Sequence, residues 1–387
     1  MLKGEDKMIL GILKYIVRFI PALISLVVSF VSIFPASTER LEQDIAEQVE
    51  RIAANELAYE NGEIASVDEA SFFAGDLAAE LEAGIKFNEI CFLATHNSYQ
   101  TSAIEETKQV YRDLSQLTFG LISEDKGQFR SETLTQQLNS GIRSFEMDVE
   151  VFDREGEISF TCMHSPYIEM ATSCYDFALG IKEIAMWSDN NPNHLPVTII
   201  IEPKSLFLPL ENMKAFNIDY VDEFDSMLRE TLGEKLFTPA DMLRNYASFG
   251  EMRAADDWCK VSDTLGKVMI LLHEGGITEK YIDLDPSIKS QAMFPMLRLK
   301  DIDRDCASFI LCNNAGKLLK KSDEVKESRV IVRTRADEFT SVTKERYEQA
   351  MASPAQIIST DYPPRTDSTA ESYVVSFGNN ATVRKTS

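Results

Sequence analysis

Short apolar runs alternate with longer polar segments through the middle of the chain, between about residues 87 and 364. Most of the polar segments are long enough to hold a helix, as residues 210–233 are. Buried strands that alternate with helices indicate parallel β/α units. The runs that predict strands are EICFLA, SFEMDVEV, ISFTCM, PVTIII, KVMILL, SFILC, RVIVR and QIIST.

Seven or eight such strands in about 280 residues predict an α/β fold, an irregular closed TIM barrel. A doubly wound open sheet is the alternative, but no glycine-rich phosphate loop follows any strand. The barrel is irregular because only FDREGE separates SFEMDVEV from ISFTCM, which is too short for a helical crossover. A hairpin fits this connection better and brings His164 roughly opposite Glu146.

The N-terminal 38 residues form an apolar segment behind a basic flank. Phe19 to Thr38 is a stretch of 20 residues without a charge, and lysines and an arginine precede it. This pattern predicts a signal peptide or an uncleaved signal anchor over 1–38, and a buried core helix is the alternative. Because the basic flank stays in the cytosol, we expect the rest of the chain to be secreted or membrane-anchored on the extracytoplasmic side.

Three further segments follow the N-terminal one. Residues 39–84 are acidic and alanine-rich with apolar positions at helical spacing, and they predict a helical stalk or packing helix. The barrel is expected over 85–365, and 366–387 is expected to be a loose tail rich in Ser, Thr and Asn. The apolar positions of the stalk are Leu41, Ile45, Val49 and Ile52.

Charge excludes some classes of binding partner, and the cysteine content bears on whether the protein is exported. Lys plus Arg total 39 against 62 Asp plus Glu, a formal net charge of -23. Such a surface argues against nucleic-acid binding and against electrostatic adhesion to anionic bilayers, but it tolerates a bound cation. Six cysteines fit an exported protein, and Cys162 and Cys174 could clamp the loop around His164, although free buried thiols are the alternative. No protein partner can be inferred.

Polar side chains gather at the carboxyl ends of the predicted strands, where barrels keep their active sites. A spacing of two places Glu146 with Asp148, and Glu202 with Lys204, on one face of each strand. The strand-end residues are His96, Asn97, Glu146, Asp148, His164, Glu202 and Lys204.

Three carboxylates that converge on a barrel mouth repel one another unless a cation joins them. With the amide oxygen of Asn97 they form an oxygen set suited to Ca²⁺, with Mg²⁺ possible and Zn²⁺ disfavoured. Two histidines beside such an ion suit phosphoryl chemistry, in which one steadies charge and one protonates the leaving oxygen. The two remaining histidines, His194 and His273, are expected to be structural or peripheral.

Several segments carry a resemblance to the Ca²⁺-dependent phosphatidylinositol-specific phospholipase C family, in its small secreted branch. They are THNSY, LTQQLNSGIRSFEMDVEVF, the segment from MHSPYIEM to TIIIEPK, VRTRAD and QIISTDYP. The resemblance implies an irregular TIM barrel that cleaves the glycerol-side phosphodiester of an inositol phospholipid in a membrane. It also implies that His96 and His164 are catalytic. The residues it implies for one Ca²⁺ ion are Asn97, Glu146, Asp148 and Glu202.

Other strand-end residues are expected to hold phosphate and inositol, with rim salt bridges as the alternative. These residues are Lys204, Arg333, Arg335, Asp361 and Tyr362. Signalling members of the superfamily place lysines on a middle strand to bind extra headgroup phosphates. Here GKVMILLHEGG offers His273 and Glu274 instead, which puts polyphosphorylated substrates in doubt.

Two other functions compete with the phospholipase. A glycerophosphodiester phosphodiesterase also uses a barrel, a metal and two histidines. In that family, however, the first histidine is followed by an arginine, whereas His96 of this chain is followed by Asn97. A catalytically inactive, membrane-tethered lipid-binding protein would not need both histidines and all four metal ligands. The sequence therefore predicts a calcium-dependent phospholipase C that releases diacylglycerol and a cyclic or open inositol phosphate.

Overall fold

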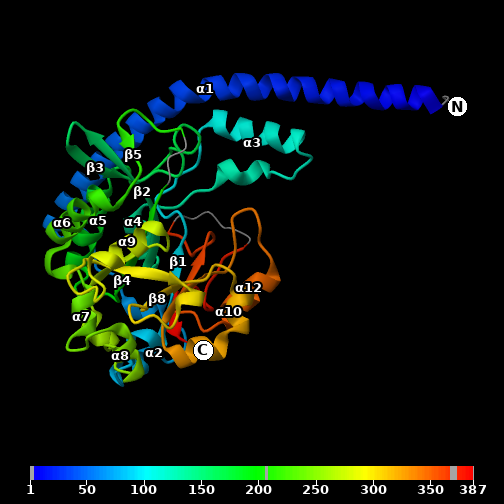
Figure 1. Cartoon of the computed structure of the whole chain (residues 1–387). Helices are drawn as coiled ribbons and strands as arrows, with labels where there is room; N and C mark the ends of the chain where they lie inside the picture. Colours follow the sequence, from blue (N-terminus) through cyan, green and yellow to red (C-terminus); the bar gives the residue numbers. More distant parts are fainter. Residues whose placement is uncertain (1–3, 205–207, 367–372, 387) are drawn as a thin grey trace.

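The computed structural model describes residues 4–204, 208–366 and 373–386, with side chains from residue 19 onward. Parts of the predicted signal segment (1–3 and the side chains of 4–18) and of the predicted tail (367–372 and 387) therefore lie outside the described residues. A long helix, α1 (Gly4–Glu60), runs across one end of a β/α barrel and extends well beyond it (Figure 1).

Eight parallel strands close the barrel, since β1 pairs with both β10 and β2. This confirms the predicted TIM-type barrel. The barrel strands are β1 (Ile90–Thr95), β2 (Ser144–Arg154), β4 (Val197–Pro203), β6 (Val268–Leu272), β7 (Met293–Arg298), β8 (Phe309–Leu311), β9 (Ile331–Arg335) and β10 (Ile357–Thr360).

Helices surround the barrel and fill most of the crossovers (Figure 1). The α-helices after α1 are α2 (Leu77–Glu82), α3 (Glu105–Leu117), α4 (Leu134–Asn139), α5 (Phe177–Asn190), α6 (Val221–Leu232), α7 (Pro239–Leu243), α8 (Phe249–Ala254), α9 (Gly276–Leu284), α10 (Ala315–Lys320), α11 (Ser322–Ser328) and α12 (Lys344–Ala352). The 3-10 helices are η1 (Glu69–Phe72), η2 (Phe87–Glu89), η3 (Glu124–Gln128), η4 (Ile218–Tyr220), η5 (Gly233–Lys235), η6 (Val261–Thr264) and η7 (Leu299–Asp301).

Side chains of each barrel strand alternate between two faces. On β2, Phe145, Met147 and Val149 pack in the apolar cluster that also contains residues of α5 and α6. The residues between them, Glu146 and Asp148, therefore face the barrel interior. The same alternation directs the side chain of Glu202 inward at the end of β4.

The predicted hairpin is present between β2 and β3 (Glu157–Thr161). Its turn has positive φ at Glu155 (57°) and Gly156 (93°), as a two-residue turn between antiparallel strands requires. The register pairs Glu150 with Thr161, so His164 follows three residues after the end of β3. A short strand, β5 (Met213–Lys214), pairs with the other edge of β2.

Two strands differ from the expected pattern. The strand β7 was not predicted, because it contains Pro295. Proline has no backbone N–H to donate to a neighbouring strand, so its presence in a sequence argues against a central strand. β11 (Val383–Lys385) pairs antiparallel with β1, and Val375 and Val383 are fully buried. The described end of the chain is therefore packed on the barrel and not loose, because its few apolar residues cover the start of β1.

Helix α1 has two different halves. Its second half docks on the barrel through a mixed face: Ile52 of the predicted apolar face is buried together with Asp44 and Gln48, whereas Val49 is 50% exposed. Its first half exposes large apolar side chains from Phe19 to Phe34. The part from Phe19 to Glu60 is long and apolar enough to cross a membrane by length and composition alone, with a mean hydropathy of 2.2 in its most apolar stretch.

Candidate active site

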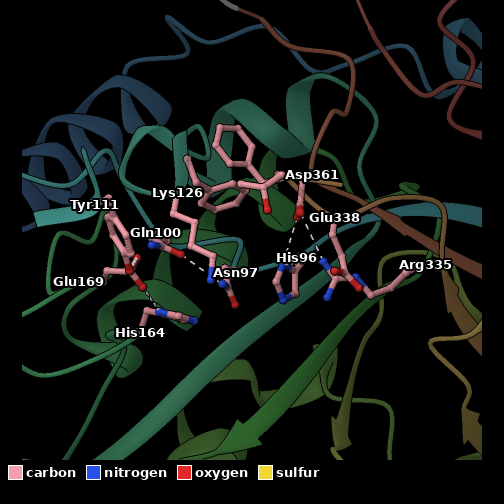
Figure 2. A pocket seen from close by; sticks show the side chains of 13 residues that line it. His96, Asn97, Gln100, Tyr111, Lys126, His164, Glu169, Arg335, Glu338 and Asp361 are labelled. Atoms are coloured by element: carbon pink, nitrogen blue, oxygen red, sulfur yellow. Dashed lines mark hydrogen bonds and ion pairs between the residues drawn. The ribbon is translucent and has the colours of Figure 1, made fainter. Parts of the chain in front are cut away.

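A cavity of about 250 Å³ opens at the carboxyl end of the barrel. The predicted residues that line it are His96, Asn97, His164, Arg335 and Asp361. Figure 2 shows the two histidines on opposite sides of Asn97, each beside a carboxylate. The fold therefore brings residues from both ends of the barrel sequence to one cavity.

His96 directly follows β1, and its partners come from the two strands next in the sheet. Its Nδ1 lies 3.0 Å from Asp361 Oδ1, and Arg335 Nη2 lies 3.3 Å from Asp361 Oδ2. Asp361 is held in turn, because its backbone N–H donates to Asp337 Oδ1 at 2.8 Å. Burial raises the pKa of Asp337 to about 6. The other ring nitrogen, Nε2, lies 3.9 Å from Glu146 Oε1, at the edge of the acidic cluster.

The acidic cluster lies in the barrel interior beside His96. Asp148 and Glu202 are register partners on adjacent strands, and Glu146 lies two residues before Asp148. One atom each of Glu146, Glu202 and His273 lie within 4.8 Å of one another. His273 was expected to be structural or peripheral, but the end of β6 carries it to this cluster. His194 is buried and contacts Ser188 Oγ at 2.8 Å, as a structural residue does.

Two basic side chains balance the cluster. Arg333 pairs with Glu146, and Lys204 Nζ lies 2.9 Å from Asp148 Oδ2 and 3.0 Å from Glu202 Oε1. Burial by itself would raise the pKa of Glu146, but the charge of Arg333 outweighs it and holds the pKa at about 2. Burial raises the pKa of Asp148 despite the charge of Lys204.

The donor set fits a hard divalent cation. Asp148 Oδ1 and Glu150 Oε2 are buried without a hydrogen-bond partner among the described residues. Burial and the charge of Asp148 raise the pKa of Glu150 to about 9. Asn97 has a left-handed φ of 45°, and its amide nitrogen donates to Gln100 Oε1 at 3.1 Å. Its amide oxygen remains as the atom that suits a cation.

His164 lies across the cavity from His96 and is held by Glu169. The His164 Nδ1 atom contacts Glu169 Oε2, and the Tyr111 hydroxyl donates to Glu169 Oε1 at 2.6 Å. Burial would lower the pKa of His164, but the hydrogen bond and charge of Glu169 outweigh it and raise the pKa. The sequence did not single out either partner: Glu169 lies inside the segment MHSPYIEM but at no strand end, and Tyr111 lies on α3.

The residues expected to bind phosphate and inositol divide into two groups. Arg335 and Asp361 line the cavity. Arg333 is 1% exposed and contacts Glu146, Asn313 and Ser359. Its guanidinium group therefore holds the acidic cluster in place. Lys204 is likewise engaged with carboxylates. The Tyr362 hydroxyl donates to the carbonyl of Phe339 at 2.6 Å, and its ring stacks on Phe339.

Phe339 and Thr340, from the loop after β9, line the cavity together with Lys126 and Phe129 from the segment after α3. These residues lie in connections whose sequence carries no periodic pattern. Only the closed barrel brings the two loops together.

A barrel with two histidines, each beside a carboxylate, next to an acidic cluster defines a metal-assisted phosphodiesterase. Residues 155–386 match the model of the family described as phosphoinositide phospholipase C, Ca²⁺-dependent. The chain belongs to this family and is a phosphoric diester hydrolase. A comparison with curated protein sequences finds no significant match.

Solved structures of two bacterial enzymes share the fold. One is a calcium-dependent phosphoinositol-specific phospholipase C from the Gram-negative Pseudomonas sp., with a TM-score of 0.54 and 16% identity over 82% of this chain and 99% of that one. A myo-inositol complex of the Pseudomonas enzyme gives a TM-score of 0.53 with 16% identity over 82% of this chain and 98% of that chain. The other is the Ca²⁺-dependent phosphatidylinositol-specific phospholipase C of Streptomyces antibioticus, with a TM-score of 0.51 and 18% identity over 72% of this chain and 95% of that one.

Proposed function

We propose that this phospholipase C cleaves the glycerol-side phosphodiester of phosphatidylinositol at the cavity between His96 and His164. The observation that carries the proposal is the pairing of each histidine with its own carboxylate on opposite sides of one cavity. The family match supports a phospholipase C reaction, and the myo-inositol complex of the Pseudomonas enzyme supports inositol as the headgroup of the substrate.

Asn97, Glu146, Asp148 and Glu202 would hold one Ca²⁺ ion, and His273 lies close enough to contact the same site. When bound, calcium supplies positive charge for the phosphate oxygens and lowers the pKa of a nearby hydroxyl. Arg333 keeps Glu146 ionised and fixes its position through their buried ion pair. Lys204 balances Asp148 and Glu202, so the site can stay folded before the ion arrives.

The ring hydroxyl next to the phosphate is the expected nucleophile, because an intramolecular attack has an effective molarity of about 10⁵ M or more when well oriented. Its oxygen bonds to phosphorus as the bond to the glycerol oxygen breaks. His96 and Arg335 stabilise the charge on phosphorus, and His164 gives its proton to the glycerol oxygen. A carboxylate of the acidic cluster, Glu146 or Glu202, would accept the hydroxyl proton.

Hydrolysis of a panel of lipids, with and without a calcium chelator, tests the substrate. We expect turnover of phosphatidylinositol that the chelator abolishes, with a cyclic inositol phosphate as the first product in phosphorus NMR. Preferred hydrolysis of deacylated glycerophosphodiesters would favour the rival phosphodiesterase. Absence of turnover with calcium bound would favour the inactive lipid-binding protein.

We also propose that α1 attaches the enzyme to a membrane on the extracytoplasmic side. Helix α3 packs along one side of the apolar half of α1, where Gln109 Nε2 donates to Ser25 Oγ at 3.5 Å. The opposite side carries Ile24 and Val31, which are 59% and 66% exposed. Burial of this apolar side in lipid would contribute about 25 cal/mol for each Å².

The variant Ile24→Glu/Val31→Glu tests the membrane attachment. We expect it to be released from vesicles while it still hydrolyses dispersed substrate, because neither residue touches the cavity. A variant that stays bound to vesicles would contradict the proposal.

A further inference from the structure

The loop from His164 to Glu169 turns back on itself just after β3. Ser165 N–H donates to the Glu169 carbonyl at 3.2 Å, and Glu169 N–H donates to the Ser165 carbonyl at 3.0 Å. Tyr167 takes a left-handed φ of 62° at the turn. This closed turn returns the side chain of Glu169 to His164, although neither residue belongs to a strand or helix.

Both carboxylate oxygens of Glu169 are engaged, and the two contacts come from different elements. Oε2 contacts His164 Nδ1, and Oε1 accepts the hydrogen bond of the Tyr111 hydroxyl at 2.6 Å (Figure 2). Glu169 is 8% exposed and lines the same cavity as the two histidines. Helix α3 also holds the loop backbone, because Thr107 Oγ1 donates to the Ile168 carbonyl at 2.7 Å. The carboxylate is therefore fixed in position and direction.

A carboxylate on Nδ1 decides what the other ring nitrogen can do. It accepts the Nδ1–H and so orients the ring with Nε2 free for the substrate. It also stabilises the imidazolium form, which is the form that a general acid needs. Because His164 and Tyr111 engage both carboxylate oxygens of Glu169, the effect of Glu169 acts through His164.

We propose that Glu169 is the positioning residue of His164, and that the Tyr111 hydroxyl holds Glu169 in place for that role. The proposal rests on the function of His164 as the general acid given above. It assigns to α3 a part in the reaction, since Tyr111 connects this helix to the leaving-group side of the cavity.

Charged and hydrogen-bonding groups around His164 come from five elements. Glu169 from its own loop and Asp148 from β2 favour the protonated ring, Lys204 from the end of β4 opposes it, and Tyr111 from α3 contacts the carboxylate. Burial would raise the pKa of Glu169, but the hydrogen bond and charge of His164 outweigh it and lower the pKa, and Lys126 from η3 acts in the same direction. A general acid loses activity as pH rises through its pKa. Loss of the Glu169 charge should therefore move the descending limb of the pH profile to lower pH.

The test compares Glu169→Gln with the unchanged full chain on two substrates. One is phosphatidylinositol, and the other is a nitrophenyl inositol phosphate whose leaving group needs no proton. We expect kcat on the lipid to fall by about 10²-fold, the lower range for a general acid, with little change in KM or in turnover of the nitrophenyl substrate. Glu169→Asp should restore part of the activity. Tyr111→Phe should give the same pattern with a smaller loss.

Asp44→Asn is the matched control. Asp44 of α1 accepts the Thr172 N–H at 2.9 Å and so supports the same segment without touching His164. We expect this variant to lower the unfolding temperature, with equal effects on both substrates and an unchanged descending limb. Equal losses on both substrates in Glu169→Gln, or an unmoved limb, would overturn the positioning role.

His164→Gln separates this inference from the proposed function. If His164→Gln spares the nitrophenyl substrate and Glu169→Gln does not, only the positioning role fails. If His164→Gln reduces both substrates equally, the general-acid role itself fails. Should Glu169→Gln not fold, Tyr111→Phe decides the question, and a Tyr111→Phe variant with no selective loss on the lipid would overturn the proposal.

Discussion

The two histidine sites face one cavity but are built in different ways. His96 and its partners Asp361 and Arg335 stand at the ends of three strands that are neighbours in the barrel, β1, β10 and β9. His164 lies beyond a hairpin outside the barrel wall, and its partner Glu169 is fixed by a turn and by α3. The barrel itself determines the first site, whereas peripheral elements position the second.

This difference has a physical basis. Strand ends in a closed barrel are fixed by the ladders on both sides, so the side chains that follow them need little extra support. A loop has no such ladder and must be held by specific contacts. Helix α1 provides some of them: Gln48 exchanges hydrogen bonds of 2.8 Å with the backbone of Asp176, and Ser37 donates to the Tyr167 carbonyl.

The largest expected effect comes from His96→Gln. Because His96 faces charge that develops on phosphorus whatever the leaving group, we expect turnover to fall by about 10³-fold on both the lipid and the nitrophenyl substrate. Steady-state kinetics on the two substrates checks this against the selective loss expected for His164→Gln. A selective loss in His96→Gln would show that the two histidines do not have different roles.

The variant Glu146→Gln should weaken calcium binding and activity together, because it removes a charged ligand. It also leaves Arg333 buried without its ion-pair partner, which costs about 3–5 kcal/mol of unfolding free energy. Calorimetric calcium titration and denaturant unfolding measure the two effects. The double variant Glu146→Gln/Arg333→Met should recover stability but not calcium affinity, and unchanged calcium affinity in Glu146→Gln would exclude this residue from the metal site.

The smallest effect should come from Gln48→Ala. Gln48 is buried and both ends of its amide are bonded, so its loss costs about 1–3 kcal/mol of unfolding free energy. We expect calcium affinity to stay unchanged, because the acidic cluster belongs to the barrel. Thermal unfolding and calcium titration together check the comparison, and a loss of calcium affinity would mean that α1 also supports the His96 side.

The acidic cluster was predicted from the sequence only in part. Apolar runs marked the strands, and a spacing of two placed Glu146 and Asp148 on one face; the structure has both inside the barrel beside Glu202. The roles of these residues stay predictions. The prediction did not include Glu150, although Glu150 lies inside the run SFEMDVEV and continues the spacing of two that places Glu146 and Asp148 on one face. It also placed His273 at the periphery, because a single histidine after a strand has no distinguishing spacing.

The sequence by itself determined the barrel, the hairpin that carries His164 and the apolar N-terminal segment, because periodicity and run length are local properties of the chain. Tertiary structure decided the use of Pro295 within β7, the pairing of Val383–Lys385 with β1 and the buried polar contacts of Asp44 and Gln48 on α1. It also decided that Tyr111 contacts Glu169 and that Glu169 contacts His164. These contacts join residues that are far apart or lie in loops without a pattern, and only the closed barrel and its packed helices bring them together.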